Sequence, residues 1–217
     1  MLIFDCDGVL VDSEVLVTDV HVRALRRLGL NISHAQLVER FLGVTDHSMY
    51  AALEVELGRP LPEDYDQQVS EEVYRRSARE LRAVTGAAAA IRRIRGPVCV
   101  ASSSSREMLD YKLSVTGLVR LFGAAIFSAD AVARGKPAPD IFQYAAREMG
   151  IAAAECLVVE DSENGVKAAV AAGMEVIGFT GGSHLSRSHG ACLIDVGARA
   201  VAEDFAALMQ LAPERFR

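Results

Sequence analysis

The sequence predicts an α/β protein whose core is a doubly wound, Rossmann-like parallel sheet with an inserted all-helical domain. Short apolar runs alternate with segments of helical periodicity, and this alternation is typical of a parallel sheet flanked by helices. Between residues 13 and 84 the alternation stops, and only helical patterns occur. We therefore expect an α/β core of residues 1–12 and 85–217 and a helical insert of residues 13–84.

Five short runs are the expected strands of the sheet. Each is apolar over nearly all of its consecutive residues, as expected for a strand that is covered on both faces. The runs occupy residues 2–5, 98–101, 125–127, 157–160 and 176–179. Ligand sites of open α/β sheets lie at the carboxyl ends of the strands, so the residues that follow these runs are the first candidates for function.

Caps and apolar spacing predict three helices between the later strands. Serine accepts hydrogen bonds at a helix start, so Ser104 or Ser105 can begin the first helix. Proline favours the first turn of a helix and glycine the position after its last turn, which predicts a second helix from Pro139 to Gly150. A third helix is expected over residues 164–172.

The insert carries helical signals throughout its length. Apolar residues recur at helical spacing over residues 17–28. Ser33 and Gln36 have the spacing of a capping box, in which each side chain bonds the backbone of the other, ahead of a second helix. Two further helices are expected over residues 45–57 and 63–83.

Composition and charge exclude several classes of partner. The formal net charge is −6 without a basic stripe, so we expect no nucleic-acid partner, and no apolar run is long enough to span a bilayer. The first residues lack the basic start and cleavage site of a signal peptide. Four widely spaced cysteines are expected to be free thiols of a reducing, cytoplasmic compartment: Cys6, Cys99, Cys156 and Cys192. The sequence does not indicate an oligomeric state.

An acidic pair follows the first expected strand. Side chains alternate along a strand, so Asp5 and Asp7 can point the same way. Two close carboxylates repel each other unless a cation or proton lies between them, and Mg²⁺ is the preferred oxygen-liganded cation. One carboxylate can then attack a phosphorus while the other transfers the proton of the leaving group. Gly8 allows a tight turn close to a ligand. A plain acidic turn after a strand fits the same residues.

A run of serines follows the second expected strand. The hydroxyls and free amides of Ser102, Ser103 and Ser104 lie where a helix begins, and such groups bind phosphate oxygens. A serine-rich loop that only caps the helix is an equally good interpretation of this run on its own.

A lysine and a second acidic pair complete the set of candidate residues. Lys136 lies between Gly135 and Pro137, and a rigidly held cation can stabilise the charge of a transition state, although a solvated loop lysine fits as well. Glu160 and Asp161 end the strand of residues 157–160. Acidic residues that end two neighbouring strands would form one cation site from both sides.

In this order, the candidate residues resemble the motifs of the haloacid dehalogenase-like superfamily. The resemblance covers essentially the whole chain and is closest to the branch that contains β-phosphoglucomutase and many sugar-phosphate phosphatases. It implies that Asp5 is the nucleophile and Asp7 the general acid/base of the first motif. It also implies that the helical segment of residues 13–84 is a cap that closes over the substrate.

The resemblance assigns roles to the later motifs as well. Ser102 would bind the transferring phosphate, and Lys136 would stabilise the charge of the nucleophile and the phosphoryl group. Asp161 would be a direct Mg²⁺ ligand beside the carboxylate of the nucleophile and the backbone carbonyl of Asp7. Glu160 would bind the ion directly or through water.

These roles predict a magnesium-dependent phosphatase of a small phosphorylated sugar, sugar acid or polyol. The alternative is a β-phosphoglucomutase-like mutase. Such a mutase would have a cap histidine where this chain has Val17, and a phosphate-holding arginine where this chain has Asp46, of opposite charge. A non-enzymatic phospho-aspartate switch is a further alternative, but a long-lived acyl phosphate needs no adjacent Asp7. A dehalogenase of the same fold would need neither Asp7 nor a magnesium site.

Overall fold

The protein is described by a computed structural model that covers residues 1–41, 46–185 and 188–217, with the side chains of residues 46 and 47 left out. Contacts within the chain divide it into two compact units. The first unit consists of Met1–Asp12 and Arg82–Arg217, and the second of Ser13–Leu81.

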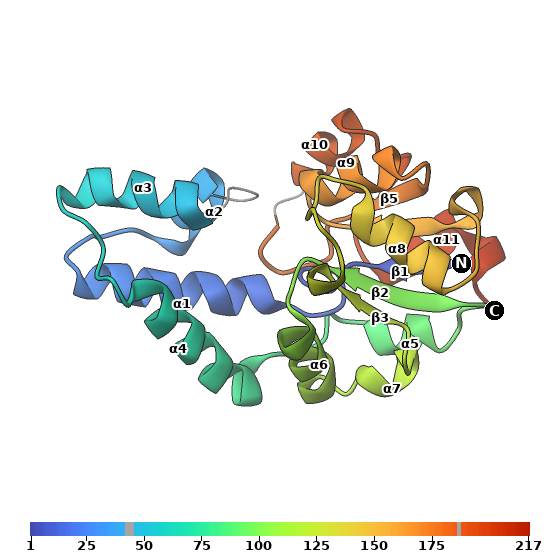
Figure 1. Ribbon diagram of the computed structural model, residues 1–217, viewed down its shortest axis with the longest axis horizontal. Helices are drawn as coiled ribbons and strands as arrows, with labels where there is room; N and C mark the ends of the chain where they lie inside the picture. The colour runs from blue at the N-terminus through green and yellow to red at the C-terminus, as the bar shows by residue number, and fades with distance from the viewer. Residues whose placement is uncertain (42–45, 186–187) are drawn as a thin grey trace. The chain divides into compact units, whose positions relative to one another are not determined.

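The first unit is built on a parallel sheet, as the sequence predicts. Within the described residues the sheet has six strands in the order β3-β2-β1-β4-β5-β6 (Figure 1). The first strand along the chain therefore lies in the middle, paired with β2 on one side and β4 on the other. The strands are β1 (Leu2–Phe4), β2 (Val98–Ser102), β3 (Ile126–Ser128), β4 (Leu157–Glu160), β5 (Glu175–Phe179) and β6 (Ala200–Ala202).

All five expected strands are present, with ends that differ by a residue at most, and a sixth was not predicted. Strand β6 is only three residues long and consists of Ala-Val-Ala, so a single valine is its only residue of high strand propensity. It forms an edge of the sheet by pairing with β5, where Ile177 lies opposite Ala200. Pairing with an existing strand, rather than the local sequence, accounts for β6.

Helices cover both faces of the sheet (Figure 1). Alternate residues of β1 show the two layers: Ile3 belongs to a buried cluster with Phe142 and Val166, whereas Phe4 lies 6.3 Å, between ring centroids, from Phe205. This confirms the doubly wound architecture. The helices are α5 (Ala87–Ile91), α6 (Arg106–Val115), α7 (Val119–Phe122), α8 (Asp140–Glu148), α9 (Glu163–Ala171), α10 (His189–Asp195) and α11 (Phe205–Leu211).

All the regular elements of the second unit, among its described residues, are helices. Its helices are α1 (Ser13–Arg27), α2 (His34–Phe41), α3 (Asp46–Leu57) and α4 (Tyr65–Glu80). The expected capping box is present: the amide of Ser33 donates to Oε1 of Gln36, at 3.0 Å, and the amide of Gln36 donates to Oγ of Ser33, at 3.2 Å. Fully buried Leu25 and Leu53 belong to one apolar cluster that packs the unit together.

Polar groups on three helices of this unit converge on Asp19. Its carboxylate accepts hydrogen bonds from Arg76, at 2.6 Å, and from His34, at 2.9 Å, and it pairs with Arg23 at 2.8 Å. Burial raises the pKa of Asp19, but the hydrogen bonds from Arg76, His34 and Arg23 outweigh burial and lower it to about 2. The ionised form is therefore the one that the fold stabilises.

Asp19→Asn is expected to destabilise the helical unit by about 1–2 kcal/mol near neutral pH. Because the folded-state pKa lies below that of the unfolded chain, the stabilisation by Asp19 is fully present above about pH 4 and is lost as the pH falls towards about 2. Amide hydrogen exchange in α1 and α4 of the full chain, measured at about pH 5 and about pH 3, checks this pH dependence. Glu72→Gln, in an exposed pair with Arg75, is the control and should change little. Equal losses for the two variants would contradict the prediction.

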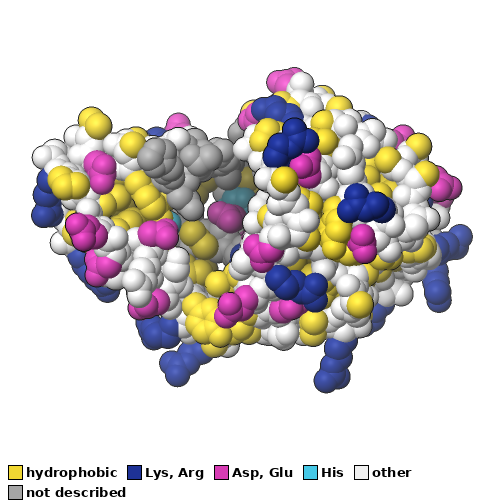
Figure 2. Space-filling view, in the orientation of Figure 1, with side chains coloured by type: hydrophobic (Ala, Val, Ile, Leu, Met, Phe, Trp, Pro, Cys, Tyr) yellow, Lys and Arg dark blue, Asp and Glu magenta, His cyan; other side chains and the backbone are white. Residues whose placement is uncertain are grey.

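Surface and cysteine properties complete the description. Acidic and basic side chains are mixed over the face shown in Figure 2. None of the described helices is both long enough and apolar enough to cross a bilayer. All four cysteines are free thiols, as expected: Cys6, Cys99 and Cys156 are buried, and Cys192 is exposed.

Candidate active site

The carboxylate of Asp5 lies buried at the carboxyl end of the central strand. Strand β1 ends at Phe4, and the amide of Asp5 still donates to the carbonyl of Val159 on the neighbouring strand, at 3.0 Å. Asp5 as a whole is 6% exposed, and its carboxylate accepts a hydrogen bond from Lys136. Burial, followed by the charge of Glu160, raises the pKa of Asp5 well above its usual range, while Lys136 opposes this shift.

Lys136 is a buried cation between two carboxylates. Its Nζ lies 2.6 Å from Oδ1 of Asp5 and 2.7 Å from Oε2 of Glu160, and it also donates to the carbonyl of Ala101 at 3.3 Å. Burial lowers the pKa of Lys136, but the charges of Asp5 and Glu160 outweigh burial and raise it above its ordinary value. The lysine is therefore charged and fixed in place, unlike a solvated loop lysine.

Three buried carboxylates form a group that fits a divalent cation. One oxygen each of Asp5, Glu160 and Asp161 lies within 4.8 Å of the others. The single positive charge of Lys136 does not balance three close carboxylates, and uncompensated buried charges of like sign are strongly unfavourable. Hard oxygen donors in this number are the ligands that Mg²⁺ takes up. The donor set therefore fits the expected ion, and Asp5, Glu160 and Asp161 are the side chains that could hold it.

The turn after the nucleophile candidate requires glycine. Gly8 has a φ of +75°, and a Cβ at this position would lie 1.8 Å from Oδ2 of Asp161. A second glycine, Gly182, packs against this turn, since a Cβ at Gly182 would lie 2.7 Å from the carbonyl oxygen of Gly8. Any side chain at Gly8 would displace Asp161 from the acidic group. The absence of a side chain at Gly8 therefore leaves the space that the carboxylate of Asp161 occupies.

The carboxylate of Asp7 is bound by groups from the start of α6. Ser104 donates its hydroxyl to Oδ2 at 2.8 Å, and Lys112 donates to Oδ1 at 2.5 Å. Ser104 is held in turn, because its amide donates to the buried hydroxyl of Ser102 at 3.1 Å. Ser103 is exposed, and Ser105 is the residue that caps α6.

The predicted residues thus meet at one edge of the sheet in two groups. In the first group, Lys136 lies among the buried carboxylates of Asp5, Glu160 and Asp161. In the second, Ser104 binds the carboxylate of Asp7. The side chain of Asp7 is not part of this buried acidic group.

A family model for haloacid dehalogenase-like hydrolases matches residues 1–173. The chain belongs to this family. The curated 6-phosphogluconate phosphatase of Escherichia coli is 31% identical over 182 residues, which cover 83% of this chain and 82% of the relative. The expected branch, which includes sugar-phosphate phosphatases and β-phosphoglucomutases, is confirmed as well.

Solved structures of haloacid dehalogenase-like proteins share the whole fold. A protein of unknown function from Agrobacterium tumefaciens is 38% identical, with a TM-score of 0.92, and the match covers 98% of this chain and 97% of that one. A family hydrolase from Deinococcus radiodurans, solved with bound phosphate and sodium, is 32% identical, with a TM-score of 0.86, and the match covers 98% and 94%.

Two residues beside the haloacid dehalogenase-like motifs were not predicted. Lys112 lies at core-facing spacing between fully buried Leu109 and Leu113, and a lysine at such a position is a signal that could have been used. His184, on a loop after β5, has its Nε2 3.4 Å from Oδ2 of Asp161. No local pattern marks His184, because only the fold brings the two segments together.

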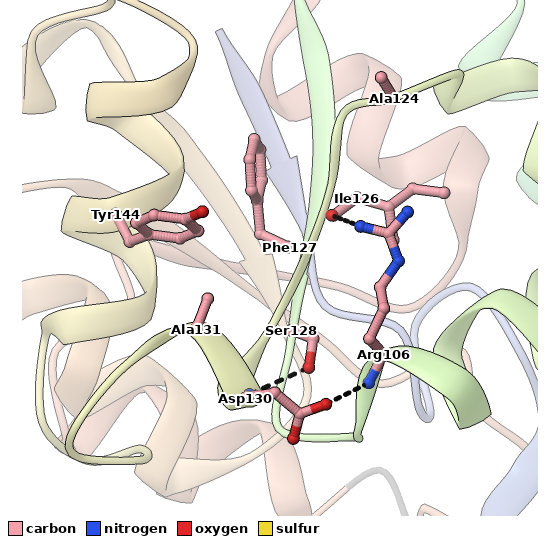
Figure 3. Close-up of a pocket in the computed structure, with 8 residues that line it drawn as sticks. All are labelled: Arg106, Ala124, Ile126, Phe127, Ser128, Asp130, Ala131 and Tyr144. Atoms are coloured by element: carbon pink, nitrogen blue, oxygen red, sulfur yellow. Dashed lines mark hydrogen bonds between the residues drawn. The ribbon is translucent and has the colours of Figure 1, made fainter.

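A separate cavity of about 370 Å³ lies beside the edge strand β3 (Figure 3). Its polar groups bond one another: Arg106 donates through its side chain to the carbonyl of Ile126 and through its amide to Asp130, whose own amide donates to Ser128. None of the motif residues of the family lines it. The chemistry that the family uses is therefore not found in this cavity.

Proposed function

We propose that this protein is a magnesium-dependent phosphatase that hydrolyses a small phosphorylated sugar, sugar acid or polyol through an aspartyl phosphate on Asp5. The observation that carries the proposal is the pairing of the buried Asp5 carboxylate with the fixed ammonium of Lys136, at 2.6 Å, beside two further carboxylates. A carboxylate is an anionic nucleophile, and it can attack a phosphoryl group when nearby cations neutralise the charge of the phosphoryl oxygens.

In the first step, an oxygen of Asp5 attacks phosphorus in line, and the bond from phosphorus to the ester oxygen breaks. Asp7 donates a proton to the departing oxygen, so the alcohol leaves neutral. Lys136 stays beside Asp5 and neutralises charge on the phosphoryl oxygens. Mg²⁺, when bound by Asp5, Glu160, Asp161 and the backbone carbonyl of Asp7, supplies Lewis-acid stabilisation of the same charge.

In the second step, Asp7 accepts a proton from water as the water oxygen attacks the phosphorus of the aspartyl phosphate. The bond between phosphorus and the Asp5 oxygen breaks, which releases inorganic phosphate and restores the carboxylate. Ser102 and Ser103, which precede α6, supply hydroxyl donors for the phosphate oxygens. Ser104, the third serine predicted for this role, instead donates its hydroxyl to Asp7 and its amide to Ser102. We assign the helical unit, Ser13–Leu81, the role of a cap that limits access of water and contributes side chains that recognise the substrate.

A phosphatase fits this chain better than a mutase. The position expected to hold a mutase's cap histidine is Val17, in α1, whose side chain can neither donate nor accept a proton. The distinction also depends on Asp46, which replaces the arginine expected in a mutase. The side chain of Asp46 and the residues 43–45 before it lie outside the described part of the structure. The similarity to a 6-phosphogluconate phosphatase supports a sugar acid phosphate as a substrate class to test first.

Purified protein is expected to release phosphate from members of a phosphometabolite panel in the presence of Mg²⁺, and chelation by EDTA is expected to abolish the release. Mg²⁺ should also raise the midpoint of thermal unfolding, since a ligand that binds only the folded state stabilises it. Asp161→Asn should remove most of this rise, which is a readout independent of turnover. Activity that is unchanged by EDTA, or a midpoint that does not respond to Mg²⁺, would contradict the proposed metal dependence. A bisphosphate-dependent isomer product would favour the mutase.

A further inference from the structure

Lys112 occupies a buried position on a helix, where removing the ammonium of a lysine from water costs free energy. It is on α6 between Leu109 and Leu113, both fully buried, and its own side chain is 11% exposed. An apolar side chain of similar length would fill the position without removing an ammonium from water, and replacing buried ion pairs by apolar residues is often neutral or stabilising. Packing alone therefore does not explain Lys112.

Lys112, Ser104 and Asp7 are linked to one another by three hydrogen bonds. Lys112 donates to Oδ1 of Asp7 at 2.5 Å and to the hydroxyl of Ser104 at 3.1 Å. Ser104 donates that same hydroxyl to Oδ2 of Asp7 at 2.8 Å. Both carboxylate oxygens are thus held from α6 and the turn before it, so rotation of the carboxylate would break at least one charge-assisted bond.

Asp7 nevertheless stays accessible. Its side chain is 21% exposed, about twice the exposed fraction of Lys112, so part of it can be reached from solvent. Each carboxylate oxygen has two lone pairs, so a hydrogen bond from Lys112 or Ser104 does not by itself prevent an oxygen from accepting another. Asp7 can therefore exchange a proton with a water or an ester oxygen while Lys112 and Ser104 hold it in place.

We propose that Lys112 is the positioning residue of the general acid/base Asp7, in parallel with Lys136, which pairs with the nucleophile Asp5. The inference rests on the proposed phosphatase function. It adds Lys112 to the residues that serve this function, and Lys112 lies outside the motifs recognised in the sequence. Each aspartate of the first motif then has its own buried ammonium, one from α6 and one from the segment before α8. Proton transfer requires a fixed donor–acceptor geometry, so loss of Lys112 should slow only the steps in which Asp7 transfers a proton.

The two steps of the reaction differ in their need for Asp7, and an aryl phosphate separates them. Nitrophenolate leaves without accepting a proton, so formation of the aspartyl phosphate from p-nitrophenyl phosphate does not need Asp7. Hydrolysis of the intermediate always does, because water must lose a proton. An alkyl phosphate needs Asp7 in both steps.

The experiment compares wild type, Lys112→Met and Lys112→Gln in pre-steady-state kinetics with p-nitrophenyl phosphate. For Lys112→Met we expect a burst of nitrophenolate at a rate within about threefold of wild type, followed by a steady state about 10–100-fold slower, since positioned acid–base catalysis contributes about 10²–10⁴-fold. Turnover of an alkyl phosphate should fall by a similar factor, with KM changed by less than about threefold. Lys112→Gln keeps a neutral donor and should recover part of the lost hydrolysis rate.

Lys167→Met, which removes an exposed lysine on α9, is the matched control and should behave as wild type. Equal slowing of the burst and the steady state, or a steady state within about twofold of wild type, would overturn the positioning role while leaving the phosphatase intact. If Lys112→Met does not fold, the same criteria apply to Lys112→Gln. A folded wild type that forms no nitrophenolate and no phosphate from any substrate would overturn the phosphatase and the positioning role together.

Discussion

Asp5→Asn is expected to lower phosphate release by at least about 10⁴-fold, the largest effect of any single substitution in this site. The amide has nearly the same shape as the carboxylate but no anionic oxygen that can attack phosphorus. It also cannot form the acyl phosphate on which the second step depends. Both steps are therefore lost together, in contrast to the selective loss expected for Lys112→Met.

The same substitution should leave the protein at least as stable as wild type when no metal is present. Asp5 and Glu160 both face Lys136, and removing one of two close buried charges relieves repulsion while Glu160 keeps its ion pair. A catalytic group that destabilises the fold is common at active sites. Phosphate release and urea unfolding in EDTA, measured on one preparation, check the two expectations.

Asp130→Asn is the matched control, because Asp130 lies just after β3 as Asp5 lies just after β1, outside the candidate site. It should retain activity close to that of wild type, since an asparagine oxygen can still accept from the amide of Arg106. Substantial turnover by Asp5→Asn, above about one-tenth of wild type, would show that another group attacks phosphorus.

Sequence patterns predicted the sheet and most of the candidate site for one physical reason. The apolar runs of a parallel sheet end at a common edge, so the residues after them are neighbours in space even when they are far apart in the chain. Asp5, Lys136 and Glu160 meet in this way, with Lys136 within 2.7 Å of both carboxylates. The burial of Lys136, which separates a site cation from a loop lysine, became visible only in the fold.

Features that depend on contacts between distant segments were not predicted. Strand β6 pairs with β5, and its Ala-Val-Ala sequence is too short, with one strand-favouring residue, to predict a strand. His184 lies near Asp161 because a glycine loop brings it there: Ser183 donates its amide to Asp12 at 3.0 Å, and Gly182 packs against the turn at Gly8. None of these contacts has a periodicity or a spacing that a single sequence displays.

Lys136→Met is expected to lower turnover by about 10³-fold, comparable with the loss of a fixed group that stabilises transition-state charge. Lys136 pairs with the nucleophile and with Glu160, so its loss removes the cation from the atoms where charge develops. It should also destabilise the fold by about 3–5 kcal/mol in EDTA, because removal of one partner leaves buried charges without compensation. Steady-state kinetics and urea unfolding measure the two effects.

A double variant separates the catalytic role of Lys136 from its structural one. Lys136→Met combined with Glu160→Gln removes the cation and one of the two carboxylates that it balances, so most of the lost stability should return. Activity should not return, because Asp5 still attacks without a fixed ammonium beside it. Recovery of both stability and turnover would mean that Lys136 only neutralises Glu160. Recovery of stability alone, with turnover well below that of Glu160→Gln measured by itself, would place the ammonium of Lys136 at the reacting atoms, since those two variants differ only at residue 136.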